Sequence, residues 1–108
     1  MQPILFHGTS LSDLKAFPDG PRREAGCQLD KVQRGQEPVD WKPMTSIGPG
    51  VKEIRLHEPW GAFRVIYVAK FADGVHVLPC FEKTSRKTAL TDIETAARRY
   101  RALLRGVP

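Results

Sequence analysis

The sequence predicts a single α+β domain in which an N-terminal helical hairpin packs on an antiparallel β-sheet and a C-terminal helix follows. Apolar residues recur at helical spacing before residue 35 and again after residue 90, whereas residues 51–81 alternate and are rich in β-branched and aromatic side chains. The chain has 108 residues, 41% of them hydrophobic, which fits one domain over residues 1–108 with one core.

The first elements are a short strand and a short helix. Ile4–Phe6 is apolar and predicts a strand, and Ser10–Asp13 matches the pattern of a serine followed three residues later by an acid that begins a helix. Pro18 cannot continue a helix, so this one is expected to end after about two turns.

A second helix is expected directly afterwards. Pro21 suits a first helical position, and Ala25, Leu29 and Val32 share one helical face. Gly35 provides a natural end. The apolar side of these two helices must pack against another element. Only the second half of the chain has enough apolar β-strands to bury it.

The second half of the chain is predicted to form an antiparallel meander of β-strands. Residues 35–50 contain several prolines and glycines and are expected to be the least ordered stretch. Val51–Leu56, Phe63–Phe71 and Val75–Phe81 are predicted strands. Asp73-Gly74 between the last two is a strong signal for a two-residue hairpin turn.

The last element is a helix. Thr91–Glu94 matches a capping box. The helix is expected to bury one apolar face, which consists of Ile93, Ala97, Tyr100 and Leu104, and to expose several arginines.

The two-residue turn fixes which side chains share a sheet face. Three pairs are then expected to oppose one another on one face, namely Val68 with Pro79, Ile66 with Phe81 and Arg64 with Lys83. The opposite face is expected to pack on the N-terminal helices, and it holds Phe63, Val65, Tyr67, Ala69, Phe71, Leu78 and Cys80.

The first strand of the meander adds further charge to the polar face. If the loop between Leu56 and Phe63 has an even length, Ile54 and Leu56 join the core, while Glu53 and Arg55 join Arg64 and Lys83. Like charges on neighbouring strands cost up to about 1 kcal/mol per pair, so such a cluster needs a compensating role.

The overall charge is compatible with such a role. The chain has 17 Lys and Arg against 12 Asp and Glu, a formal net charge of +5, which attracts polyanions such as nucleic acid. A solvated charged face on which Glu53 relieves the repulsion accounts for the cluster equally well at this stage.

Neither a metal, a cofactor nor a membrane is expected as a partner. Cys27 and Cys80 lack metal-ligand spacing and predict free thiols in a cytoplasmic protein. No apolar run approaches the ~20 residues that span a bilayer, and the N-terminus does not resemble a signal peptide. His7, His57 and His76 are expected to be structural or solvated.

Several short segments resemble a known protein family in their order and spacing. They are Leu14–Pro18, Leu29–Gly35, Lys42–Met44, Glu53–Arg55, Arg64–Val68, Phe81–Lys83 and Lys87-Thr88. Together they are similar to the phage-derived Gp49-like group within the RelE/HigB/ParE superfamily of toxins.

The resemblance implies both a fold and an activity. The fold would be a compact one with N-terminal helices packed on an antiparallel sheet of three to five strands. The activity would be that of a type II toxin, a ribosome-dependent endoribonuclease that cleaves mRNA by metal-free attack of the RNA 2'-OH. The partners would be the ribosome, mRNA and a cognate antitoxin, in HigB-like pairs commonly a helix-turn-helix protein of the HigA kind, with which the toxin can form a hetero-oligomer.

This chemistry requires groups that position and neutralise a phosphate and groups that transfer protons. The candidate catalytic residues are Arg55, Arg64 and Lys83, with the arginines suited to bidentate phosphate contact. A lysine can bind the RNA backbone on either side of the scissile phosphate or, when it is desolvated, help in proton transfer. The candidate RNA-binding residues outside this set are Lys87, Arg86 and Arg98.

The last strand departs from the pattern of the family. Many relatives carry His-x-Phe-x-Lys-Lys there, whereas this chain has Pro79 in place of the histidine and Thr84 in place of the second lysine. Glu82 is the nearest replacement in sequence, but alternation directs it to the face opposite Lys83.

Two other functions remain open for this scaffold. A ParE-like toxin would inhibit DNA gyrase, and the fold alone does not separate the two activities. The juxtaposition of Arg55, Arg64 and Lys83 favours RNA. The missing histidine and lysine keep a third reading open, that of a degenerate member which binds RNA or its antitoxin without catalysis.

Overall fold

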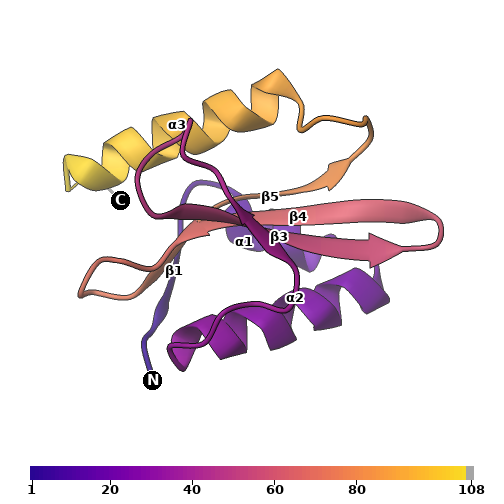
Figure 1. Cartoon of the computed structure of the whole chain (residues 1–108), viewed down its shortest axis with the longest axis horizontal. Helices are drawn as coiled ribbons and strands as arrows, with labels where there is room; N and C mark the ends of the chain where they lie inside the picture. The colour runs from indigo at the N-terminus through magenta and orange to yellow at the C-terminus, as the bar shows by residue number, and fades with distance from the viewer. Residues whose placement is uncertain (107–108) are drawn as a thin grey trace.

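The computed structural model describes residues 1–106 as a five-stranded sheet with helices on both faces (Figure 1). The elements follow the chain as β1 (Ile4–Phe6), α1 (Ser10–Lys15), α2 (Asp19–Gln33), β2 (Trp41–Pro43), β3 (Val51–Glu58), β4 (Gly61–Val68), β5 (Val75–Lys83) and α3 (Leu90–Leu104). The predicted α+β class, with N-terminal helices and a C-terminal helix, is confirmed.

The sheet has the strand order β1-β5-β4-β3-β2. Strands β2 to β5 pair in antiparallel fashion, whereas β1 runs parallel to β5 with Leu5 opposite His76. Strand β2 lies within the segment that was expected to be the least ordered. Its three residues pair with β3, with Lys42 opposite Glu53, because an edge strand needs only one partner and tolerates Pro43.

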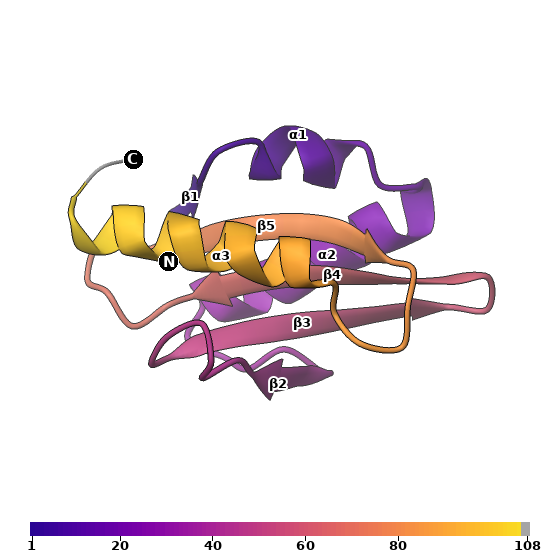
Figure 2. The same ribbon diagram turned by 90° about the horizontal axis from the view of Figure 1, so that it is seen from above.

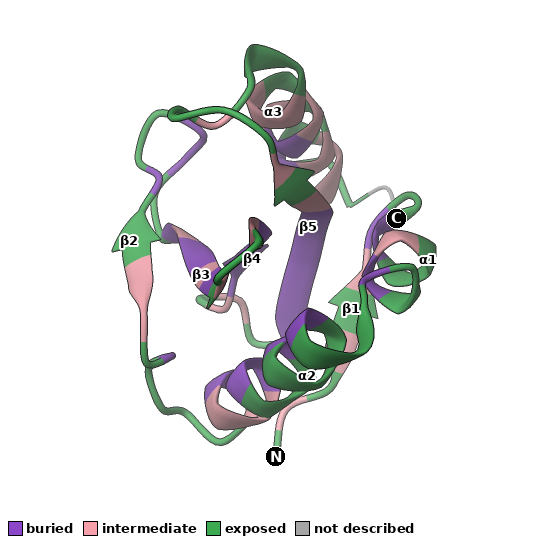
Figure 3. Ribbon diagram, turned by 90° about the vertical axis from the view of Figure 1, so that its right-hand side faces the viewer, coloured by how far each residue is buried: buried purple, intermediate pink, exposed green. Residues whose placement is uncertain are grey.

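Helix α2 covers one face of the sheet, and α1 lies beside β5 at the same side of the molecule (Figures 2 and 3). Ala25, Leu29 and Val32 are buried against strand residues such as Ile54 and Val65, as the helical spacing predicts. The helix starts at Asp19, two residues before Pro21.

Helix α3 covers the opposite face. Ala96 and Tyr100 are buried and pack against Ile66 and Leu78, whereas Leu104, expected on the apolar face, is 57% exposed. The predicted capping box is wrong, because the cap residue is Ala89 and no side chain makes a capping hydrogen bond at the start of the helix. None of the helices in residues 1–106 combines the length and apolar character needed to cross a membrane.

The connection between β4 and β5 differs from the predicted two-residue hairpin. The strands end at Val68 and begin at Val75, so six residues connect them. Gly74 has a φ of 144°, and a Cβ at this position would lie 2.5 Å from the carbonyl oxygen of Pro3. The glycine is therefore required both by its positive φ and by the close approach of the chain before β1.

The register of β4 and β5 differs from the prediction accordingly. Arg64 lies opposite Phe81, not Lys83, and the pairing shifts between Val65 and Tyr67 where β5 contains an extra residue. This bulge directs Leu78 to the α3 side of the sheet, and Phe71 also packs there, so both predicted contacts with the N-terminal helices are wrong.

Two histidines form a buried chain of polar contacts at the β1 side of the sheet. The Nε2 atom of His7 lies 2.9 Å from Nδ1 of His76, and Nε2 of His76 lies 2.8 Å from a carboxylate oxygen of Asp73. His7 is 7% exposed and His76 is 2% exposed. Burial lowers the pKa of His7 below its ordinary value of 6.5, and the neighbouring His76 and Arg99 lower it further.

The lowered pKa predicts that acid destabilises the protein. The unfolded chain binds a proton at His7 at a higher pH than the folded chain does, so stability is greatest above about pH 6.5 and falls as the pH drops below it. Thermal melting of wild type and His7→Gln between about pH 7.5 and about pH 5.5 measures this effect. The variant should lose less stability than wild type over this range, and equal losses would contradict the assignment.

Candidate functional site

The three cationic side chains expected to cluster do lie on one face of the sheet. A two-residue turn, Pro59-Trp60, connects β3 to β4 and places Arg55 directly opposite Arg64. Lys83 follows two residues after the partner of Arg64 on β5, so it shares the same face. The even loop length assumed from the sequence is confirmed, although the expected pairing of Arg64 with Lys83 is not.

This part of the face is not covered by a helix in the described part of the chain. Helix α3 packs over the half of the sheet that holds Val51, Val68 and Leu78, and the β3–β4 hairpin extends beyond it (Figure 2). Arg55 and Lys83 are partly exposed as a result, while Arg64 is only 3% exposed.

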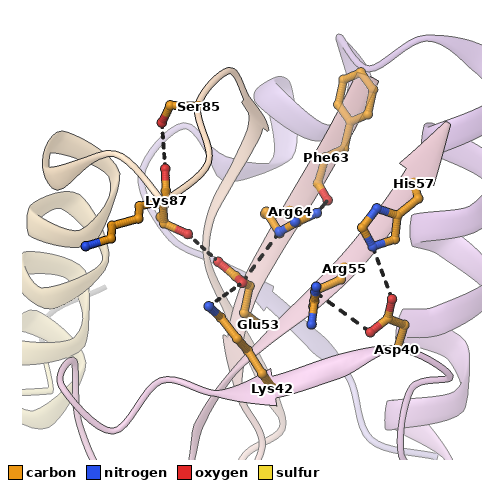
Figure 4. A network of polar contacts seen from close by, with 10 residues as sticks. Asp40, Lys42, Glu53, Arg55, His57, Phe63, Arg64, Ser85 and Lys87 are labelled. Atoms are coloured by element: carbon orange, nitrogen blue, oxygen red, sulfur yellow. Dashed lines mark hydrogen bonds and ion pairs between the residues drawn. The ribbon is translucent and has the colours of Figure 1, made fainter. Parts of the chain in front are cut away.

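Glu53 is the centre of the polar network on this face (Figure 4). It is fully buried, and its Oε1 atom lies 3.5 Å from Nε of Arg64 and 3.8 Å from Nζ of Lys42. Its other oxygen accepts a hydrogen bond of 3.0 Å from the Thr88 hydroxyl. A buried carboxylate of this kind is retained only where cations or donors compensate its lost hydration.

The arginines retain unused hydrogen-bonding capacity. The Nε atoms of Arg55 and Arg64 and the Oε1 atom of Glu53 are buried without a hydrogen-bond partner. Burial lowers the pKa of Arg64, and Arg55 lowers it further, while Glu53 opposes the shift. Arg64 donates one bond of 2.9 Å to the carbonyl oxygen of Phe63. The two guanidinium groups are thus held together by the fold with only partial compensation.

Lys42 is a member of this cluster that the sequence did not single out as a site residue. It reaches Glu53 because β2 pairs with β3, and the sequence lacks an alternating pattern long enough to reveal a three-residue strand. We call the set Lys42, Arg55, Arg64 and Lys83 the basic patch.

The loop between β5 and α3 borders the basic patch. The Thr88 hydroxyl ties this loop to Glu53, and the preceding residues Arg86 and Lys87 are exposed. Arg98 lies on the exposed side of α3, and no hydrogen bond or ion pair between described residues joins it to the patch. The structure therefore places this loop at the border of the basic patch, but no hydrogen bond or ion pair between described residues joins the side chains of Lys87, Arg86 or Arg98 to it, and Figure 4 shows Lys87 directed away from Glu53.

His57 also lies on this face, two residues after Arg55 on the same strand. Its Nε2 atom lies 3.2 Å from a carboxylate oxygen of Asp40, whose other oxygen lies 3.8 Å from Nε of Arg55 (Figure 4). Asp40 is fixed here because its carbonyl oxygen accepts a bond of 2.9 Å from the amide of Arg55. His57 was expected to be structural or solvated, and its side chain is exposed, but its pairing with Asp40 depends on the segment before β2 and was not predicted.

The positions that depart from the family pattern are not part of the basic patch. Pro79 is buried in the irregular segment of β5, and Thr84 is exposed just after the strand. Glu82 lies opposite Phe63, on the other face from Lys83, as alternation predicts. Residues 1–106 contain no group of three or more His, Cys, Asp or Glu side chains arranged to hold a metal ion.

The comparisons with known proteins agree with the resemblance seen in the sequence. The model of the family described as "Phage derived protein Gp49-like (DUF891)" matches residues 12–101. The matched segment includes every residue of the basic patch. No match to a curated protein was found.

Proposed function

Because the chain belongs to the phage-derived Gp49-like family, we propose that it is the toxin of a type II toxin–antitoxin pair and cleaves messenger RNA on the ribosome. Membership of this family is consistent with a role as the toxin of a toxin–antitoxin pair. The endoribonuclease activity is the finer part of the proposal, and it rests on the basic patch.

The observation that carries the proposal is the direct opposition of Arg55 and Arg64. Two like charges on neighbouring strands destabilise a sheet, and each guanidinium here has one carboxylate at ion-pair distance, Glu53 for Arg64 and Asp40 for Arg55. A phosphodiester would relieve the repulsion between the two arginines. This arrangement favours RNA over a protein target such as gyrase, which would not require phosphate-binding groups on one face.

Three cations of the basic patch have roles in the proposed reaction. Arg55 and Arg64 bind the scissile phosphate and stabilise the charge that develops on its oxygens in the transition state. Lys83 lies beside them and either holds the phosphate or transfers a proton to the leaving oxygen. The RNA 2'-OH is the nucleophile, so the reaction needs no external one.

Residues outside the centre would extend the RNA contact. Lys87 and Arg86 in the loop before α3 are exposed beside the patch and suit flanking phosphates. Arg98 on α3 would contact RNA only if the strand or ribosomal RNA continues over the helix. These contacts neutralise phosphate charge without reading the base sequence.

The proposed partners follow from the same function. A toxin that cuts translated messages requires an antitoxin in the cell that makes it, and we expect a helix-turn-helix protein that forms a hetero-oligomer with this chain. The basic patch is the surface that an inhibitor must cover or distort to prevent RNA from binding.

Primer extension on cellular messages after induction of the protein alone tests the proposal. Discrete new 5' ends at codon-spaced positions within translated regions are the expected result. Induction of DNA-damage signals with intact messages would instead indicate a gyrase inhibitor, and growth without either signal would contradict a toxin.

A further inference from the structure

The basic patch has an imidazole on one side that the proposed function does not yet use. On the exposed face, His57 of β3, Ala62 of β4 and Lys83 of β5 lie in one row across the sheet, since Ala62 pairs with both of the others. Arg55 and Arg64 form the neighbouring row. His7 and His76 are buried, so His57 is the exposed histidine of this chain, and its side chain is 52% exposed.

The row leaves a space between two proton-transfer groups. Strands lie about 4.8 Å apart, so the backbones at His57 and Lys83 are separated by about 10 Å, with the methyl group of Ala62 between them. Ala62 has the smallest side chain of the row, so no bulky group of β4 separates its two ends. Arg64 is two residues after Ala62 on the same strand and face.

Asp40 prepares His57 to accept a proton. Nε2 of His57 faces the carboxylate of Asp40 at 3.2 Å, and among residues 1–106 the other ring nitrogen, Nδ1, has no hydrogen-bond partner. A carboxylate at this distance favours the tautomer that carries its proton on Nε2, so Nδ1 is the unprotonated nitrogen, and the carboxylate fixes the orientation of the ring. Asp40 is therefore a positioning residue.

Lys83 has properties that suit the opposite task. Loss of hydration lowers the pKa of Lys83 below its ordinary value, and Arg64, Lys42 and Arg55 lower it further, while Glu53 opposes them. A lysine with a lowered pKa gives up its proton more readily than a free one. The charged groups nearest to His57 are Asp40 and Arg55, with Glu58 next along β3.

We infer that His57 is the general base and Lys83 the general acid of the proposed RNA cleavage, acting on opposite sides of the scissile phosphate. This inference rests on the proposed function. In-line displacement places the attacking and leaving oxygens on opposite sides of phosphorus, so the base and the acid must face each other across it.

The reaction then balances without water or metal. Nδ1 of His57 takes the proton of the 2'-OH while the 2'-oxygen forms a bond to phosphorus. The bond from phosphorus to the 5'-oxygen breaks, and that oxygen takes a proton from the ammonium group of Lys83. The products are a 2',3'-cyclic phosphate and a free 5'-OH, and proton exchange with solvent restores both side chains. His57 thus supplies the imidazole that β5 lacks at Pro79.

A leaving-group substitution tests the two roles separately. Programmed ribosomes carry either ordinary mRNA or mRNA with sulfur in place of the 5'-oxygen at the scissile position, because a thiolate leaves without protonation. We expect His57→Ala and Lys83→Ala each to cut ordinary mRNA about 100-fold or more slowly than wild type. The sulfur substrate should restore the rate of Lys83→Ala but not that of His57→Ala, whereas added imidazole should partly restore His57→Ala.

Variants of the neighbouring carboxylates supply a second readout. Asp40→Asn should retain cutting at a reduced rate, and Glu58→Gln serves as the matched control on the same hairpin, with the wild-type rate expected.

The outcomes separate this inference from the proposed function. Wild-type cutting with an undiminished rate in His57→Ala would overturn the assignment of the base and leave the nuclease standing. Rescue of His57→Ala by the sulfur substrate would reverse the two roles and so also overturn the assignment. Absence of cutting by wild type on both substrates would remove the proposed function itself.

Discussion

Arg64→Lys is expected to abolish growth inhibition and to slow mRNA cleavage by about 100-fold or more while the protein remains folded. Lysine preserves the positive charge that compensates the buried carboxylate of Glu53, 3.5 Å away. It lacks the planar fork with which arginine binds two phosphate oxygens at once. Alanine is a poorer choice at this position, because it would leave Glu53 without its nearest cation and would confuse loss of folding with loss of function.

Cleavage rates on programmed ribosomes and thermal melting of the purified variant measure the two parts of this prediction. Arg23→Lys is the matched control, because Arg23 is exposed on α2, which packs on the opposite face of the sheet. The control should be as toxic as wild type. Full toxicity of Arg64→Lys would show that the arginine does not clamp a phosphate.

The second large effect concerns stability. Glu53→Gln should reduce the free energy of unfolding by about 3 to 5 kcal/mol, because it leaves the charge of Arg64 buried and uncompensated. The hydrogen bond with Thr88 can survive in this variant, since an amide oxygen still accepts it. Arg64→Met should reduce the free energy of unfolding by a similar amount, because it leaves the charge of Glu53 buried without its nearest cation.

The double variant Glu53→Gln/Arg64→Met identifies the interaction between the two side chains. Its loss of stability in urea should be clearly smaller than the sum of the single losses, because neither charge is then left alone. Additive losses would mean that the two groups stabilise the fold independently. The double variant is also expected to cut no RNA, which separates the stability of the patch from its function.

The sequence was sufficient to predict which side chains share a face of the hairpin. Alternation along β3 and β4 is a local property, and together with the assumed even length of the loop between them it correctly placed Arg55 and Arg64 on one side and Ile54 and Val65 on the other. The resemblance to the family also came from the sequence, and the family match over residues 12–101 agrees with it.

The details of pairing were not available from local signals. Asp73-Gly74 looks like a hairpin turn, but Gly74 is present because the chain near Pro3 passes too close for a side chain. The bulge in β5 shifts the register by a residue, and no local pattern marks it. The pairing of β2 with β3, which brings Lys42 to Glu53, joins segments that are weakly patterned on their own.

By itself, then, the sequence determined the order of the elements other than β2, the side-chain alternation of the central strands and the concentration of positive charge. Only the tertiary structure decided that Glu53 is buried among the cations, that Thr88 ties the loop before α3 to it and that Asp40 pairs with His57. The physical reason is that side-chain alternation is set by each strand alone, whereas burial and ion pairing depend on which distant segments the edges of the sheet bring together.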